Sequence, residues 1–66
     1  MDPAESKQFQ AELSSLGTAI EEITARITAI ANLLAKQKLD GYAHDLYQAE
    51  RSLKSALRSI TKVRYR

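Results

Sequence analysis

Large apolar residues recur along this chain at alternating intervals of four and three, and this spacing constrains the fold more than any other feature. The first run has eight members: Phe9, Leu13, Leu16, Ile20, Ile23, Ile27, Ile30 and Leu34. The second run has seven: Tyr42, Leu46, Ala49, Leu53, Ala56, Ile60 and Val63. Such spacing places one apolar stripe along an α-helix, whereas a β-strand requires a period of two. The sequence therefore predicts an all-α fold of two heptad helices.

A single turn signal, Asp40-Gly41, separates the two runs. Asp2, Pro3 and Glu5 occupy positions favoured at a helix start. We predict one domain of residues 1–66, with a first helix at about 3–38, a turn at about 39–41 and a second helix at about 41–64. A connection this short makes the helices antiparallel, as a coiled-coil-like hairpin.

The two predicted helices differ in length, because the first exceeds the second by about a dozen residues. These extra residues either pack on another molecule, fold back as a separate short helix, or fray, and we expect a continuous first helix.

The chain is too small to stabilise a large core by itself. It has 66 residues and no Cys, and domains of this size seldom gain more than about 3 to 5 kcal/mol from one core. The positions beside the heptad stripe are mostly small or apolar instead of charged, which is typical of a four-helix bundle. We expect the hairpin to complete such a bundle, as a homodimer or on another protein.

Six residues are candidates for this partner interface. They are Gly17, Ala31, Leu33, Tyr47, Leu53 and Leu57. An alternative is that they only broaden the contact between the two helices of one chain.

Catalytic chemistry has little basis in this sequence. His44 is the single imidazole, and without Cys or a second His there is no zinc-ligand pattern. Ser52 and Ser55 lack an activating base, and no glycine-rich phosphate loop is present. We predict a protein that is not an enzyme and that uses no metal or cofactor.

The charges are unevenly distributed along the chain. Residues 1–30 carry five acids and two bases, whereas residues 31–66 carry three acids and eight bases. The apolar runs are too short to span a bilayer, and the acidic start differs from the basic start of a signal peptide. We therefore expect a soluble, cytoplasmic protein.

Five cations gather near the end of the second predicted helix. They are Lys54, Arg58, Lys62, Arg64 and Arg66. In an antiparallel hairpin they would lie near the acidic residues Asp2, Glu5 and Glu12, which would compensate their charge. Two functional alternatives are phosphate contacts in RNA or DNA, with Tyr65 stacking on a base, and an anionic protein partner.

The size and layout of the chain resemble the YscE-like small co-chaperones of type III secretion needle subunits. The second helix of that family is similar to the stretch from Gly41 through Tyr47-Gln48 to Ser52-Leu53-Lys54-Ser55-Ala56-Leu57. This resemblance implies a helical hairpin that packs on a TPR-type chaperone and helps to keep the needle subunit from polymerising early. The first run is more Ile-rich and the tail more basic than in that family.

The architecture alone is also similar to the Rop-type RNA-binding hairpin, two copies of which form a four-helix bundle. Two functions are therefore expected: a protein-interaction adaptor or co-chaperone, and alternatively a dimeric bundle that binds nucleic acid through its basic end.

Overall fold

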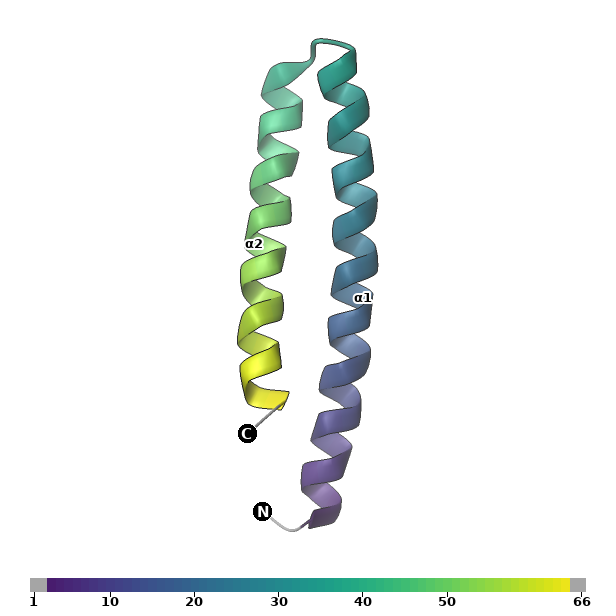
Figure 1. The fold of residues 1–66 in the computed structure, drawn as a ribbon, viewed down its shortest axis with the longest axis vertical. Helices are drawn as coiled ribbons and strands as arrows, with labels where there is room; N and C mark the ends of the chain where they lie inside the picture. Colours follow the sequence, from purple (N-terminus) through teal and green to yellow (C-terminus); the bar gives the residue numbers. More distant parts are fainter. Residues whose placement is uncertain (1–2, 65–66) are drawn as a thin grey trace.

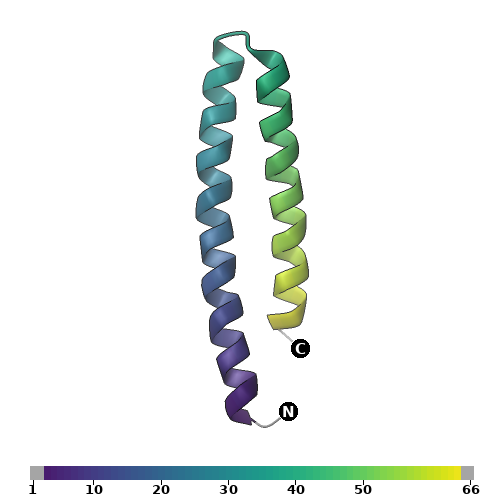
Figure 2. The ribbon, with the colours of Figure 1, turned by 180° about the vertical axis from the view of Figure 1, so that it is seen from behind.

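The computed structural model describes the backbone of residues 3–64 and the side-chain environment of residues 7–64. It contains two α-helices, α1 (Pro3–Lys36) and α2 (Asp40–Arg64), and no strand within residues 3–64. The helices pack against each other side by side and run in opposite directions (Figures 1 and 2). The predicted all-α hairpin is therefore confirmed.

The helix bounds differ slightly from those expected. α1 ends at Lys36, two residues early, and α2 begins at Asp40, one residue early. The first dozen residues continue α1 as far back as Pro3 instead of folding back as a separate helix. α1 consequently extends past the end of α2 (Figure 1).

The connection between the helices depends on Lys38 and not on the expected Asp40-Gly41 pair. Lys38 has a φ of 63°, in the left-handed region, whereas Gly41 lies in the first turn of α2 with no positive φ. The N–H of Lys38 donates to the carbonyl of Ala35 at 3.0 Å, and the N–H of Leu39 donates to that of Leu34 at 2.9 Å. These two bonds form a Schellman motif, which satisfies carbonyls at the end of α1.

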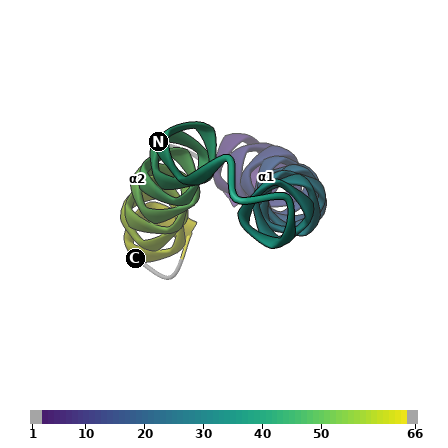
Figure 3. The same ribbon diagram turned by 90° about the horizontal axis from the view of Figure 1, so that it is seen from above.

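The molecule is a rod one helix thick (Figure 3). Its Cα atoms extend over 53 × 14 × 11 Å, and its radius of gyration is 15.6 Å. A compact domain of this length would have a radius of gyration of about 11 Å. A single layer of two helices has no third element to cover either of its faces.

Small residues form the centre of the contact between α1 and α2. Gly17, Thr24 and Ala31 are buried and recur every seven residues, while Ala43 is buried on α2. The Thr24 hydroxyl donates to its own helix, at 2.6 Å from the Ile20 carbonyl, so its burial leaves no unsatisfied donor. These side chains allow the two helix axes to approach closely.

α1 and α2 are in close contact at Gly17. A Cβ atom added there would lie 3.4 Å from Cδ1 of Leu57, which is ordinary van der Waals contact with little space to spare. A side chain larger than a methyl group at this position would have to displace the side chain of Leu57.

Candidate protein-interaction surface

Four large apolar residues of α1 remain about half exposed. Phe9, Leu16, Ile23 and Ile30 expose between 48% and 54% of their surface, and they follow one another at intervals of seven residues. We call these four residues the apolar row. The heptad stripe was expected to form the contact between the helices, and this is wrong for half of its α1 members. The other α1 members are half-buried: Leu13, Ile20, Ile27 and Leu34.

α2 carries a matching exposed row made of Tyr42, Ala56 and Val63. Each of these residues immediately precedes a residue at the helix contact, just as Leu16 precedes buried Gly17. Consecutive residues lie about 100° apart around a helix. Because both helices are right-handed and antiparallel, the same offset leads to the same side of the hairpin. The two rows thus lie on one face, which we call the apolar face.

The half-buried members of the two heptad runs lie between these rows and widen the apolar face. On α2 they are Leu46, Ala49, Leu53 and Ile60. The apolar face therefore runs along the hairpin and includes residues of both helices.

The chain exposes more surface than a compact monomer would. It exposes 5314 Å², whereas a compact monomer of 7.4 kDa exposes about 4,200 Å², which leaves an excess of about 1,100 Å². Ala31 and Ala43 are the only buried apolar residues within residues 7–64, apart from Gly17. No large side chain in this range is fully buried. The hairpin alone therefore lacks a core of large side chains.

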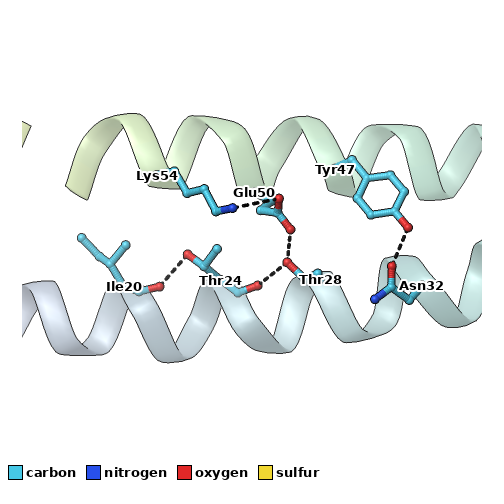
Figure 4. A network of polar contacts seen from close by, with 7 residues as sticks. All are labelled: Ile20, Thr24, Thr28, Asn32, Tyr47, Glu50 and Lys54. Atoms are coloured by element: carbon cyan, nitrogen blue, oxygen red, sulfur yellow. Dashed lines mark hydrogen bonds and ion pairs between the residues drawn. The ribbon is translucent and has the colours of Figure 1, made fainter. Parts of the chain in front are cut away.

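The opposite side of the hairpin carries polar contacts between the helices (Figure 4). The Thr28 hydroxyl of α1 donates to the carboxylate of Glu50 on α2. The second carboxylate oxygen of Glu50 lies 3.4 Å from Nζ of Lys54. Nearer the connection, the Tyr47 hydroxyl donates to Oδ1 of Asn32 at 2.6 Å. These contacts make this side of the hairpin more polar than the apolar face.

The polar contacts stabilise the ionised form of Glu50. The hydrogen bond from Thr28, followed by the positive charge of Lys54, holds the pKa of Glu50 below its ordinary value of 4.5, against an opposing effect of desolvation. The ionised carboxylate of Glu50 therefore accepts the hydrogen bond that links α2 to α1.

The structure distributes the six predicted interface residues over different surfaces. Gly17 and Ala31 are buried between the helices, and Leu57 lies half-buried against Gly17, so these three serve the contact within the chain. Tyr47 is half-buried on the polar side, where its hydroxyl bonds Asn32, and Leu53 is a half-buried member of the apolar face. Of the six predicted interface residues, only Leu33 is both large and exposed.

The sequence prediction assigned the apolar row to the contact between the helices and did not include it in the interface. One available signal was the recurrence of small residues at Gly17, Thr24 and Ala31, one position after the row. Small side chains at heptad spacing mark where two helices approach most closely.

The predicted anion-binding cations are not gathered into one unpaired cluster. Lys54 is paired with Glu50, Arg58 and Lys62 are exposed, and Arg64 is half-buried. Arg66 lies outside the described residues, as do Tyr65 and Asp2. The expected pairing of the basic end with Glu5 also falls on a side chain outside the described range.

Other chemistry has little structural support. His44 lies with its Nε2 3.0 Å from Nε2 of Gln48, one turn away on the same helix. Within the described residues, no group of three potential metal ligands and no helix apolar and long enough to cross a membrane is found. The chain matches no protein-family model, no curated protein and no solved structure.

Proposed function

We propose that the chain is a non-enzymatic protein-interaction module, an adaptor or co-chaperone whose apolar face docks on the helices of a partner. The observation that carries this proposal is the half-exposed apolar row beside a helix contact built from small residues. Large apolar residues aligned along one face are typical of a helix surface that packs on another protein.

The energetics support covering this face. Full burial of a large apolar side chain contributes about 1.5 to 3 kcal/mol, so covering the exposed half of four such residues contributes roughly 3 to 6 kcal/mol. This amount is comparable with the entire stability of a small domain, about 5 to 15 kcal/mol. The hairpin therefore becomes much more stable when a partner covers the apolar face.

The resemblance of residues 41–57 to YscE-like co-chaperones gives the proposal a specific form. In that form the partner is a helical chaperone of the TPR class and the setting is type III secretion. The exposed apolar face is a suitable surface for such a partner, since TPR repeats are themselves helical pairs.

The proposal is tested with a charge placed in the apolar row. Ile23→Asp puts a carboxylate at the middle of the face, whereas the control Ala25→Asp puts the same group at an exposed position on the polar side. Tagged wild-type chain and both variants are incubated with lysate of the native host and with untagged chain, and the bound proteins are identified by mass spectrometry.

We expect wild type and Ala25→Asp to retain the same partners and Ile23→Asp to lose them, while circular dichroism shows all three to be helical. Retention of the wild-type partners by a helical Ile23→Asp variant would contradict the proposal.

A further inference from the structure

We propose that a second copy of this chain covers the apolar face, with a two-fold axis perpendicular to the helices, so that α1 packs antiparallel on α1 and α2 on α2. This inference rests on the proposed function, because it names the partner of the same face. Three features of the hairpin lead to it: the overhang of α1, the symmetry of the apolar spacing and the excess surface.

α2, as far as Arg64, does not cover the start of α1. Gly17 lies beside Leu57, so Arg64, seven residues beyond Leu57, lies level with about residue 10 of α1. Phe9 lies past that level and remains half exposed. A second α1 that runs in the opposite direction would place its loop-proximal part, with Leu33 and Leu34, against Phe9.

The spacing of the α1 run is the same in both directions. Its intervals, from Phe9 to Leu34, are 4, 3, 4, 3, 4, 3 and 4 residues. A two-fold axis level with residues 21–22 therefore pairs every member with another member across the interface. The pairs are Phe9 with Leu34, Leu13 with Ile30, Leu16 with Ile27, and Ile20 with Ile23.

The part of the α2 run that follows Tyr42 has the same property around the same level. Its intervals from Leu46 to Val63 are 3, 4, 3, 4 and 3 residues, and their midpoint lies between residues 54 and 55. The contacts Gly17–Leu57 and Thr28–Glu50 place about residues 53–56 level with the α1 midpoint. One axis thus serves both helices.

Side-chain sizes on α2 are complementary around this axis. The axis pairs Leu46 with Val63, Ala49 with Ile60 and Leu53 with Ala56, and in the last two pairs a large residue meets a small one. Alternating large and small residues fill the space between facing helices well.

The total exposed surface of the hairpin is large enough to supply a dimer interface. The excess of about 1,100 Å² over a compact monomer exceeds the roughly 800 Å² that each partner contributes to a standard interface. A parallel arrangement, with the axis along the helices, would pack α1 on the shorter α2 of the other copy. It would leave both copies of Phe9 beyond the end of α2, which is why the antiparallel arrangement is favoured.

The arrangement is tested by distances between spin labels on two copies. The chain has no Cys, so Lys36→Cys and Glu22→Cys each provide one labelling site, and both positions are exposed. In the proposed dimer, position 36 of one copy lies level with position 7 of the other copy. The two labels at position 36 are therefore separated by the rise of 29 residues at 1.5 Å each, about 44 Å along the bundle. The two labels at position 22 lie level with each other, separated by about the 20 Å width of two helices.

Pulsed electron paramagnetic resonance on each labelled full-length chain should therefore give a long distance at position 36 and a short one at position 22. Short distances at both positions would overturn the antiparallel arrangement, because only a parallel dimer keeps both pairs level. Absence of a dipolar signal at both positions, with the molar mass of one chain, would overturn the second copy as occupant.

The last result is distinguishable from failure of the proposed function. If the labelled chain is monomeric but still captures a different protein through Ile23, the apolar face docks a partner and only the choice of a second copy is wrong. If Ile23→Asp also leaves that capture unchanged, both proposals fail.

Discussion

Two adjacent rows of α1 have opposite environments although they differ by one position in the sequence. Gly17, Thr24 and Ala31 are small and buried against α2, whereas Leu16, Ile23 and Ile30, each one residue earlier, are large and half exposed. Hydrophobicity alone would predict the reverse. The difference indicates that a close approach between two helices selects small residues at their contact and leaves the large residues one position earlier half exposed.

The same comparison explains why a two-helix layer is incomplete. Each helix can bury only the strip that faces its single neighbour, and a strip of Gly, Ala and Thr contributes little apolar area. The larger side chains border that strip on one side and polar contacts border it on the other (Figure 4). The hairpin is thus asymmetric, with one solvated surface and one apolar surface.

The largest expected effect comes from enlarging a member of the small row. Ala31→Leu introduces a side chain at a fully buried position, and overpacking of this kind costs about 1 to 3 kcal/mol. The measurement is urea unfolding followed by circular dichroism at one fixed chain concentration, since the unfolding of an assembly depends on concentration.

The matched control is Ala29→Leu, the same change at an exposed position of the same helix. We expect this variant to lie within about 0.5 kcal/mol of wild type. Equal stability of the two variants would show that the small row is not a close helix contact.

A smaller effect is expected from the polar contacts beside the small row. The pKa of Glu50 is lowered in the folded chain, so its contribution to stability is fully present above the ordinary value of 4.5 and is lost as pH falls through the lowered value. Thr28→Val removes the first cause of this lowering. We expect urea unfolding to show less loss of stability on acidification in Thr28→Val than in wild type.

Thr18→Val serves as the control for this change, because the Thr18 hydroxyl bonds only a carbonyl of its own helix, that of Ser14. It should keep the pH dependence of wild type. Identical acid sensitivity of all three chains would mean that Glu50 is not held in its charged form by Thr28.

The heptad spacing was sufficient to predict the helices, because a regular pattern of four and three residues has no other regular solution. It was insufficient to predict which heptad residues face α2. A stripe such as Ile20-Ile23-Ile27 can pack on a helix of the same chain or on a helix of another chain. The apolar side chains alone do not distinguish these two possibilities. The deciding information lay in Gly17 and Ala31, whose small size permits the close contact.

The position of the turn was predicted in part, and the six interface candidates differ in exposure. Asp40-Gly41 is a common turn signal, but the Schellman motif depends on backbone bonds that lysine can also satisfy, and Lys38 adopts the left-handed conformation instead. Among the interface candidates, Leu33 is exposed as expected, whereas Gly17 and Ala31 lie inside the hairpin. Residue type and heptad position do not show which residues are exposed and which face α2. That depends on how α1 is rotated about its own axis relative to α2.

The most direct test of the central claim, that the apolar row is covered by a second chain, is the molar mass of the unlabelled protein at micromolar concentration. Light scattering coupled to size exclusion should give twice the 7.4 kDa mass of one chain for wild type, and a value that falls toward one chain for Ile23→Asp. A wild-type chain that remains at 7.4 kDa, and that unfolds cooperatively with a midpoint independent of concentration, would contradict the account.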